Sequence, residues 1–352
     1  MSEPTLRLLS LGAGVQSTTL LLLAAEGRLP HLDAAIFSDT QWEPAAVYAH
    51  LDRIDAEVAQ PAGIPIHRVT TGNIRVDALD PAHRFASMPL FVKNKDGGDG
   101  MTRRQCSSEY KIKPIKKQVR ALLGYPHPTP VPRGVYVEQW IGISRDEIGR
   151  AKDSDTQYAR NVFPLLDLDG AADGRMGWTR EDCIRYLKAS GWESTPKSAC
   201  IGCPFHGNRQ WRQLRDTCFC GHPRDDHWRT DFDGSIRCAH ILNRHEGPDA
   251  AADLCNCPKF RAPEWDDAVD FDQQIRGGNA RGNANGKPLL GEAYLHSSRL
   301  PLADAPIDRV TWHEWKGRQT NIFDQIADTE LAEDGDPDGC SPWSCRSGQP
   351  AA

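Results

Sequence analysis

The sequence predicts an α/β protein with a doubly wound, mostly parallel sheet. Three apolar stretches with strand character, 6–11, 33–39 and 64–70, alternate with segments of helical character at 16–26 and 44–58. Strands and helices that alternate in this way form βαβ units, in which each helix crosses over so that the next strand runs parallel to the last. We therefore expect one sheet with helices packed against it.

The middle of the chain continues this pattern. The stretch 134–143, "GVYVEQWIGI", is the strongest further strand candidate, and the basic segment 109–124 runs into a helix. Another helix is predicted to begin at Thr179, because its hydroxyl can cap the first turn while Asp182, three residues on, closes the capping box. A further helix is predicted over 207–216.

Composition excludes several classes of protein. Of the 352 residues, 39% are hydrophobic and 26% are charged, as in ordinary globular proteins. The formal net charge of −6 excludes a uniformly basic surface, so binding of nucleic acid would need a local basic patch. The longest apolar run is too short to span a bilayer, and "MSEPTLR" lacks the features of a signal peptide. We expect a cytoplasmic protein with no membrane partner.

The turn between the first strand and the first helix has the composition of an anion site. Gly12 and Gly14 are followed by the hydroxyl groups of Ser17 and Thr18. Such a turn leaves backbone N–H groups open at a helix N-terminus, where the helix dipole also favours negative charge. The segment has neither the Gly-Lys-Ser/Thr of nucleoside-triphosphatase P-loops nor the spacing of a dinucleotide fingerprint. The alternative is a tight turn with ordinary caps.

Five motifs, in the same order along the chain, resemble those of one superfamily. They are "GAGVQST" (12–18), "FSDTQWEP" (37–44), "RRQCSSEYKIKPI" (103–115), "IGISRDEIGRA" (141–151) and "PKSACIGCPF" (196–205). The first resembles the PP-loop of ATP pyrophosphatases, and the others are similar to elements of relatives of phosphoadenylyl-sulfate (PAPS) reductase. The resemblance covers roughly residues 6–215. It implies the adenine nucleotide alpha-hydrolase-like fold, with ATP or an adenylyl-sulfate at the carboxyl ends of the strands.

The resemblance also implies roles for individual residues. The loop would bind the phosphates, adenosine or Mg²⁺ would lie near the end of the second strand, and cations would neutralise developing charge. For the nucleotide, the implied residues are Gly12, Gly14, Gln16, Ser17, Thr18, Asp39, Thr40 and Arg150; for catalysis they are Asp39, Lys111 and Arg145. A solvated basic face is the alternative for the cations.

The chain departs from the family pattern at three places. Gln16 stands where the PP-loop usually has Asp, and Gly12 stands where it usually has Ser. The first change removes a carboxylate that handles metal and pyrophosphate in the family. The catalytic cysteine motif of the sulfate-reducing members is missing, and "CSPWSC" at 340–345 is only a faint echo of a C-terminal cysteine pair.

Eleven cysteines in a reducing compartment indicate metal ligands or reactive thiols rather than disulfides. Cys106, Cys200 and Cys203 fall in the family-like motifs, and three thiolates suit a [4Fe–4S] cluster with one open iron. One alternative is a zinc site whose fourth ligand is His206 or a terminal cysteine. The other is three buried cysteines without metal.

The segment 218–257 has the ligands of a zinc site and too few apolar residues to order itself without one. The candidate ligands are Cys218, Cys220, His222, His227, Cys238, Cys255 and Cys257. The best set for one ion is Cys220, His227, Cys238 and either Cys255 or Cys257. The segment either binds nucleic acid through its arginines or only closes a long insertion.

These observations divide the chain into three parts. We expect a PP-loop nucleotide-binding α/β domain with the Cys-x-x-Cys element over 1–216, and a Cys/His-rich zinc-binding insertion over 217–260. A helical C-terminal extension follows over 261–352, and its acidic stretch 324–338 predicts a partly disordered tail.

Three hypotheses for function follow. The first is an ATP-dependent PP-loop enzyme that activates a nucleic acid (tRNA or DNA) or a nucleotide by adenylation, for sulfur transfer through the cysteine-bound cluster. The second is a reductase of adenylyl-sulfate or phosphoadenylyl-sulfate, against which the missing cysteine motif counts. The third is a nucleotide-binding protein without turnover whose zinc module is a docking platform, and Gln16 is its best support. The sulfur donor and the oligomeric state stay open.

Overall fold

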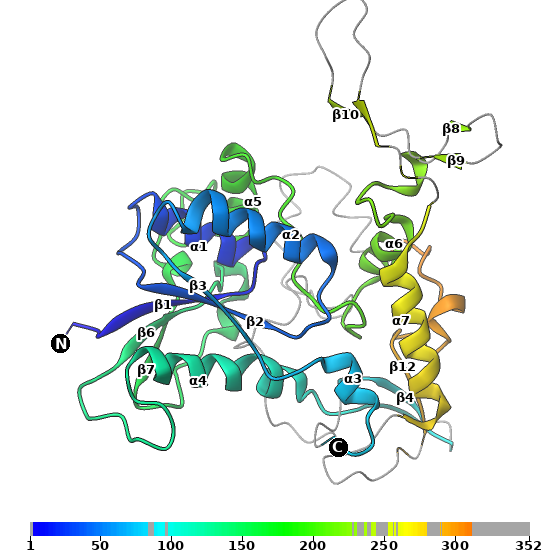
Figure 1. Cartoon of the computed structure of the whole chain (residues 1–352), viewed down its shortest axis with the longest axis horizontal. Helices are drawn as coiled ribbons and strands as arrows, with labels where there is room; N and C mark the ends of the chain where they lie inside the picture. The colour runs from blue at the N-terminus through cyan, green and yellow to red at the C-terminus, as the bar shows by residue number, and fades with distance from the viewer. Residues whose placement is uncertain are drawn as a thin grey trace, which may run out of the picture.

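The structure is a computed structural model of the chain (Figure 1). The residues that it describes are 3–83, 88–95, 98–226, 229–230, 236–237, 241–243, 253–255, 257, 260–279, 289 and 291–311. The predicted ligands His227 and Cys238 lie outside these residues, as do the acidic stretch 324–338 and the cysteines of 340–345. None of the helices that the described residues form has the length and apolar character needed to cross a membrane.

The prediction of an α/β fold with a parallel sheet is confirmed. Five strands lie in the order β3-β2-β1-β6-β7, and each neighbouring pair is parallel. Their bounds are Leu6–Leu11 (β1), Ala34–Asp39 (β2), Ile66–Thr70 (β3), Val137–Trp140 (β6) and Ala159–Val162 (β7). The chain moves from β1 through β2 to β3 and then returns to the other side of β1. The direction of winding therefore reverses between β1 and β6.

Helices cover both faces of this sheet (Figure 1). Their bounds are Val15–Ala25 (α1), Ala45–Ile54 (α2), Lys113–Leu122 (α4) and Arg180–Ala189 (α5). Helices α1, α2 and α5 share a core with Leu9 of β1, whereas α4 packs with Leu8 on the opposite face. Successive side chains of a strand point to opposite faces, so one strand contributes to both cores. In β1 the adjacent residues Leu8 and Leu9 are both apolar and fully buried, because one faces each core.

The predicted start of α5 is confirmed. Thr179 Oγ1 accepts a hydrogen bond from Asp182 N at 3.2 Å, and Thr179 N donates to Asp182 Oδ2 at 2.8 Å. These two bonds form the capping box that the sequence predicts, and they satisfy two donors of the first turn. The helix predicted over 207–216 is α6, Asn208–Asp216, with Gly207 at its N-cap.

A second core lies beside the sheet and brings together distant parts of the chain. Its elements are α3 (Ile74–Leu79), β4 (Phe91–Lys93), β5 (Asp99–Met101), α6, α7 (Pro263–Gln274) and β12 (Glu292–Tyr294). The strands form an antiparallel sheet in the order β12-β4-β5. Trp42, Tyr110, Trp211 and Phe271 are among the buried side chains of this core. The stretches 261–279 and 291–311 are therefore packed into the body of the molecule, and they contain strand β12 as well as helix α7.

A buried carboxylate fixes the end of this segment. Asp272 of α7 is fully buried, and its carboxylate accepts hydrogen bonds from Leu295 N and Leu302 N, both at 2.9 Å, and from Arg276 Nε at 3.1 Å. A buried charge is tolerated when it is paired and hydrogen-bonded in this way. The three bonds tie the chain beyond β12 back to α7.

Between α6 and α7 the chain forms two small antiparallel pairs that project from the body (Figure 1). Their strands are β8 (Arg229–Thr230), β9 (Ile236–Arg237), β10 (Ile241–Asn243) and β11 (Asp253–Leu254). Both pairs belong to the region in which the sequence predicts a zinc-binding insertion.

Candidate nucleotide and metal sites

The loop of residues 12–14 joins the carboxyl end of β1 to α1, next to the point between β1 and β6 where the winding reverses. In open α/β sheets, ligands bind outside the carboxyl ends of the strands at this point. Ala13 has φ +57°, a left-handed conformation that residues other than glycine seldom adopt. Such strain occurs mostly at functional sites, where the surrounding structure enforces it. The position and backbone of the loop therefore both indicate a ligand site.

Two backbone donors of the loop converge on one oxygen atom. Ser17 Oγ accepts hydrogen bonds from Gly12 N at 3.2 Å and from Gly14 N at 3.3 Å, and Ser17 Oγ also lies 3.3 Å from Gly14 O. Gly14 is the N-cap of α1, so the oxygen sits at the positive end of the helix dipole. The Ser17 hydroxyl thus occupies a position that the oxygen of an anion would also occupy.

The Cys-x-x-Cys segment begins against the same loop. A Cβ atom on Gly14 would lie 3.6 Å from Ser198 Cβ, and one on Gly12 would lie 4.0 Å from Ser198 Oγ. The first and fifth motifs, which are far apart in the sequence, are therefore neighbours in the fold.

The fourth motif packs against the first turn of α1. A Cβ atom on Gly142 would lie 3.0 Å from both Gln16 Cβ and Ser17 N, so only glycine fits there without a shift. Gln16 Nε2 donates to Ser144 Oγ at 3.4 Å and to Glu147 Oε2 at 3.3 Å, and Arg150 forms an ion pair with Glu147. The amide of Gln16 therefore faces a carboxylate, next to which an Asp in its place would be repelled.

Thr18 does not face the loop, although the resemblance implies that it would bind phosphate. Its side chain is fully buried, and Oγ1 shares a 3.0 Å hydrogen bond with His50 Nε2. Burial, together with the nearby charge of Arg53, lowers the pKa of His50 to about 4, so the imidazole is neutral at neutral pH. The hydroxyl of Thr18 thus links α1 to α2. This bond does not support the phosphate-binding role expected for the Thr18 side chain, because the turn of the helix directs it toward α2.

Asp39 and Thr40 end the second strand and have different environments. Asp39 Oδ1 accepts hydrogen bonds from Gln41 N at 2.7 Å and from Tyr48 Oη at 2.8 Å. Burial, followed by this bond to Asp39, raises the pKa of Tyr48, so the phenol keeps its proton. Thr40 is buried, and its Oγ1 donates to Glu43 Oε1 at 2.9 Å and lies 3.2 Å from Cys200 Sγ. The second and fifth motifs therefore also meet.

The implied catalytic cations are already engaged within the chain. The guanidinium of Arg145 pairs with the carboxylate of Asp173, and it also donates to Met176 O at 3.3 Å. This pairing lowers the pKa of Asp173. Arg150 pairs with Glu147, and Lys111 is buried in the helical turn Ser107–Ile112. A phosphate group would therefore have to compete with Asp173 for Arg145.

Cys106, Cys200 and Cys203 are all buried. Cys106 and Cys200 belong to the second core, while Cys203 packs with Ala199 and Phe205. Within the described part of the chain, the three thiols belong to no group of ligand atoms that lie within 4.8 Å of one another. The zinc alternative for these cysteines is therefore not supported. Ligands of an iron–sulfur cluster bind different irons and lie further apart, so the cluster stays a prediction.

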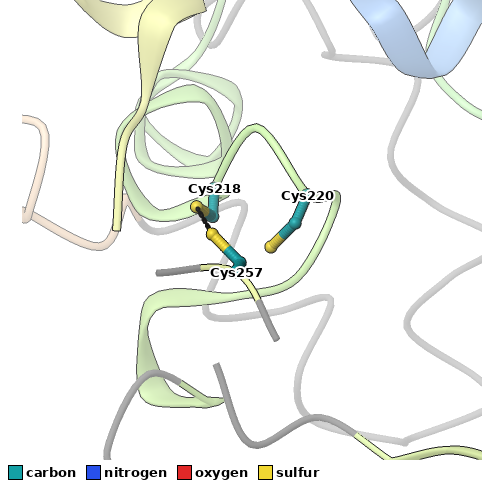
Figure 2. Close-up of side chains that lie close together, drawn as sticks. All are labelled: Cys218, Cys220 and Cys257. Carbon is teal, nitrogen blue, oxygen red and sulfur yellow. Dashed lines mark hydrogen bonds between the residues drawn. The ribbon is translucent and has the colours of Figure 1, made fainter. Parts of the chain in front are cut away.

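A group of metal-ligand type does form at the base of the insertion. Cys218, Cys220 and Cys257 have sulfur atoms within 4.8 Å of one another, and so do the ligand atoms of Cys220, His222 and Cys255. Figure 2 shows the first three side chains pointing toward one another, with 3.7 Å between Sγ of Cys218 and Sγ of Cys257. In a tetrahedral site with Zn–S bonds of about 2.3 Å, two sulfur atoms lie about 3.8 Å apart. The spacing of the thiols therefore suits a bound ion.

The backbone around Cys218 favours a thiolate. Arg261 N donates to Cys218 Sγ at 3.2 Å. Burial acts to raise the pKa of Cys218, but the N–H groups of Cys220 and Arg261 and the neighbouring thiols outweigh it and lower the pKa. Because metal ligands are thiolates, this environment prepares the sulfur for an ion.

A scan against protein-family models and a search of curated proteins find no match for this chain. The function therefore has to be inferred from the two sites.

Of the seven candidate ligands in the insertion, the structure brings together five: Cys218, Cys220, His222, Cys255 and Cys257. The set expected for one ion leaves out Cys218 and His222. His227 and Cys238, which that set includes, lie outside the described residues. The spacing Cys-x-Cys occurs at both ends of the segment, at 218–220 and at 255–257. This repeated spacing is the signal that would have selected Cys218 from the sequence.

Proposed function

We propose that this chain is an ATP-dependent PP-loop enzyme that activates its substrate by adenylation for sulfur transfer. The observation that carries the proposal is the convergence of Gly12 N and Gly14 N on Ser17 Oγ at the N-terminus of α1. A phosphate oxygen that replaces the hydroxyl as acceptor would gain both donors and the helix dipole, and the Ser17 hydroxyl, rotated aside, would itself donate to the phosphate. The fourth and fifth motifs contact this turn, and the second motif contacts the fifth through Thr40 and Cys200, which supports a shared function for them.

In the proposed reaction, an oxygen of the substrate attacks the α-phosphorus of ATP. The new O–P bond forms as the bond to the β-phosphate oxygen breaks, and pyrophosphate leaves. The loop would bind the pyrophosphate, and Asp39, the last residue of β2, would bind Mg²⁺ or adenosine. Lys111, Arg145 and Arg150 would neutralise charge, with the phosphates competing against Asp173 for Arg145 and against Glu147 for Arg150. This reaction needs positioning and charge neutralisation rather than a covalent enzyme intermediate. The substrate class that we propose is a nucleic acid, tRNA or DNA, or a nucleotide.

Sulfide then attacks the activated atom of the substrate, the bond from that atom to the adenylylated oxygen breaks, and AMP leaves with this oxygen. A [4Fe–4S] cluster bound by Cys106, Cys200 and Cys203 would supply a reactive sulfide from its open iron. Cys200 contacts Thr40, which directly follows the second strand. We place this chemistry in the cytoplasm, where thiols stay reduced.

For the group at the base of the insertion we propose zinc. Four cysteines and one histidine offer more than the four nitrogen or sulfur ligands that a tetrahedral zinc needs, and thiolate ligands exclude the hard cations Mg²⁺ and Ca²⁺. A site with all positions filled by protein ligands is structural rather than catalytic.

A second candidate function is nucleotide binding without turnover. The neutral amide of Gln16, which leaves the loop without its usual carboxylate, is the observation that favours it. A pyrophosphate-release assay separates this candidate from the enzyme. The protein is purified without oxygen and incubated with ATP in the presence of tRNA or DNA. The enzyme releases pyrophosphate at a rate that depends on the added substrate, whereas the binding protein releases none.

ATP binding by calorimetry tests the site itself. Ser17→Ala removes the hydroxyl that orders the loop and that would donate to a phosphate, so we expect affinity to fall about 10- to 100-fold. The matched control is Thr19→Val, because Thr19 lies in the same helix but bonds Val15 O inside the core. Equal affinities of Ser17→Ala and the unaltered protein would refute the assignment of the loop.

A further inference from the structure

Trp42 fastens the Cys-x-x-Cys turn to the end of the second strand. Its carbonyl oxygen accepts a hydrogen bond from Ile201 N at 2.8 Å. Its ring lies so close to Gly202 that a Cβ atom there would be 2.1 Å from Trp42 Cη2, so no other residue fits at 202 without displacing the ring. Both contacts hold the turn in the register that places Cys200 Sγ 3.2 Å from Thr40 Oγ1.

Helix α7 holds Trp42 from the other side. Trp42 Nε1 donates to Asp267 Oδ2 at 2.5 Å, and the rings of Trp42 and Phe271 pack with centroids 4.8 Å apart. Glu264 Oε1, one turn earlier on α7, accepts a hydrogen bond from Ala45 N at 2.6 Å at the start of α2. The loop between β2 and α2 is thus bonded to α7 at several points, so its position depends on that of the helix.

The metal-ligand group lies where the chain enters α7. Cys218 and Cys220 follow the last turn of α6, and Cys257 precedes α7. The two chain segments are also joined by a hydrogen bond from Phe219 N to Arg261 O at 2.8 Å. An ion bound to these thiolates would clamp the start of α7 to the end of α6.

We infer that the metal centre at the base of the insertion positions Cys200 through α7 and Trp42. The ion fixes the start of α7, Asp267 and Phe271 on α7 hold the Trp42 ring, and Trp42 holds the turn that carries Cys200. Trp42 and Asp267 are positioning residues, because they act on Cys200 only through the turn that Trp42 contacts. The inference rests on the proposed metal and not on the nucleotide chemistry.

The exchange rate of the Ile201 amide measures this connection directly, since that N–H bonds Trp42 O. Residue-resolved hydrogen exchange on the full chain would compare Asp267→Ala with Asp266→Ala, its exposed neighbour on the same helix. In Asp267→Ala we expect the Ile201 amide to exchange at least tenfold faster, while the metal content of the protein is unchanged. In Asp266→Ala the Ile201 exchange rate should equal that of the unaltered protein. The amide of Trp192, which bonds Leu187 O in the first core, should not change in either variant.

The metal arm of the test uses Cys257→Ser with metal content measured by elemental analysis. We expect metal to be lost and Ile201 exchange to rise as it does in Asp267→Ala. An unchanged Ile201 rate in either variant would overturn the inference, and so would an equal rise at Trp192, because that would report general destabilisation. Neither readout involves ATP, so a failure of the nucleotide site would leave this result unaffected.

Two glycine variants provide a second route to the same contact. Gly202→Ala inserts a Cβ into the Trp42 ring, whereas Gly149→Ala meets no atom within 4 Å. If the Ile201 amide exchanges faster in Gly202→Ala but not in Gly149→Ala, the contact between Gly202 and the Trp42 ring positions the turn. The same rate in both variants would contradict it.

Discussion

At the scale of single residues, Gln16 shows how one uncharged side chain determines the electrostatics of the loop. Gln16 and Glu147 are both buried, and the amide nitrogen lies 3.3 Å from the carboxylate. A second carboxylate at this distance would force one of the two groups to bind a proton. The neutral amide instead donates a hydrogen bond to Glu147, whose carboxylate also pairs with Arg150.

The variant Gln16→Glu tests this interpretation through the pH dependence of stability. The pKa of the introduced carboxyl should be raised above its unfolded value of about 4.3, because the group is buried beside Glu147. The folded state then binds more protons than the unfolded state between the two pKa values, so stability falls as pH rises through that window. We expect about 2 kcal/mol lower unfolding free energy than the unaltered protein at pH 7, and a smaller deficit at pH 5, by urea denaturation.

The exchange variant is the control for this prediction. Gln16→Glu combined with Glu147→Gln again gives one carboxylate and one amide, so it should recover part of the lost stability. A deficit in Gln16→Glu that is the same at pH 5 and pH 7 would contradict the account of Gln16.

Residue patterns predict which side chains gather in the loop, but not which way each one points. Gly12, Gly14 and Ser17 converge as a glycine-rich turn at a helix start predicts. Thr18 follows in the same motif, yet it bonds His50. Its direction depends on the packing of α1 against α2, which local sequence does not encode. In the same way, the pairing of Arg145 with Asp173 joins two segments whose proximity only the fold reveals.

At the scale of elements, the metal group explains how a segment poor in apolar residues is anchored. Its ligands come from the two ends of the segment, so a single ion would close the insertion at its base. The sequence predicts the presence of a zinc site, because cysteine and histidine density is a local property. It does not determine which ligands pair, because seven candidates allow many sets.

Metal content and thermal stability test the assignment of the ligands. We expect the purified protein to contain one zinc per chain at this site, and Cys218→Ser to lose it and to unfold about 5 °C or more below the unaltered protein. Cys183→Ala is the matched control, since Cys183 is a buried cysteine of the first core and should keep the zinc. Full zinc occupancy in Cys218→Ser would remove Cys218 from the ligand set.

At the scale of the whole molecule, the sheet follows from sequence more readily than the second core. The alternation of apolar strands and helices predicts the parallel sheet. The second core joins Trp42 and Tyr110 to Phe271 and Leu295, which lie far along the chain. Pairing of β12 with β4 also joins distant segments. The composition of the chain changes at residue 216, but the second core contains residues from both sides of that position. The change in composition therefore does not mark the boundary between the two cores.

The arrangement of the two cores brings the Gly12–Ser17 turn and the Cys-x-x-Cys turn close together. The first turn lies at the carboxyl end of β1, and the Cys-x-x-Cys turn lies between it and the second core. The central claim is that the Gly12–Ser17 turn binds the phosphate groups of an adenine nucleotide.

Nuclear magnetic resonance of [15N]glycine-labelled protein during titration with ATP and Mg²⁺ tests that claim most directly. The account predicts that the amide signals of Gly12 and Gly14, assigned by substitution, shift saturably. Gly124 and Gly134, which follow α4 and precede β6 at the opposite edge of the sheet, should stay in place. Saturable ATP binding that leaves the Gly12 and Gly14 signals unchanged would contradict the account.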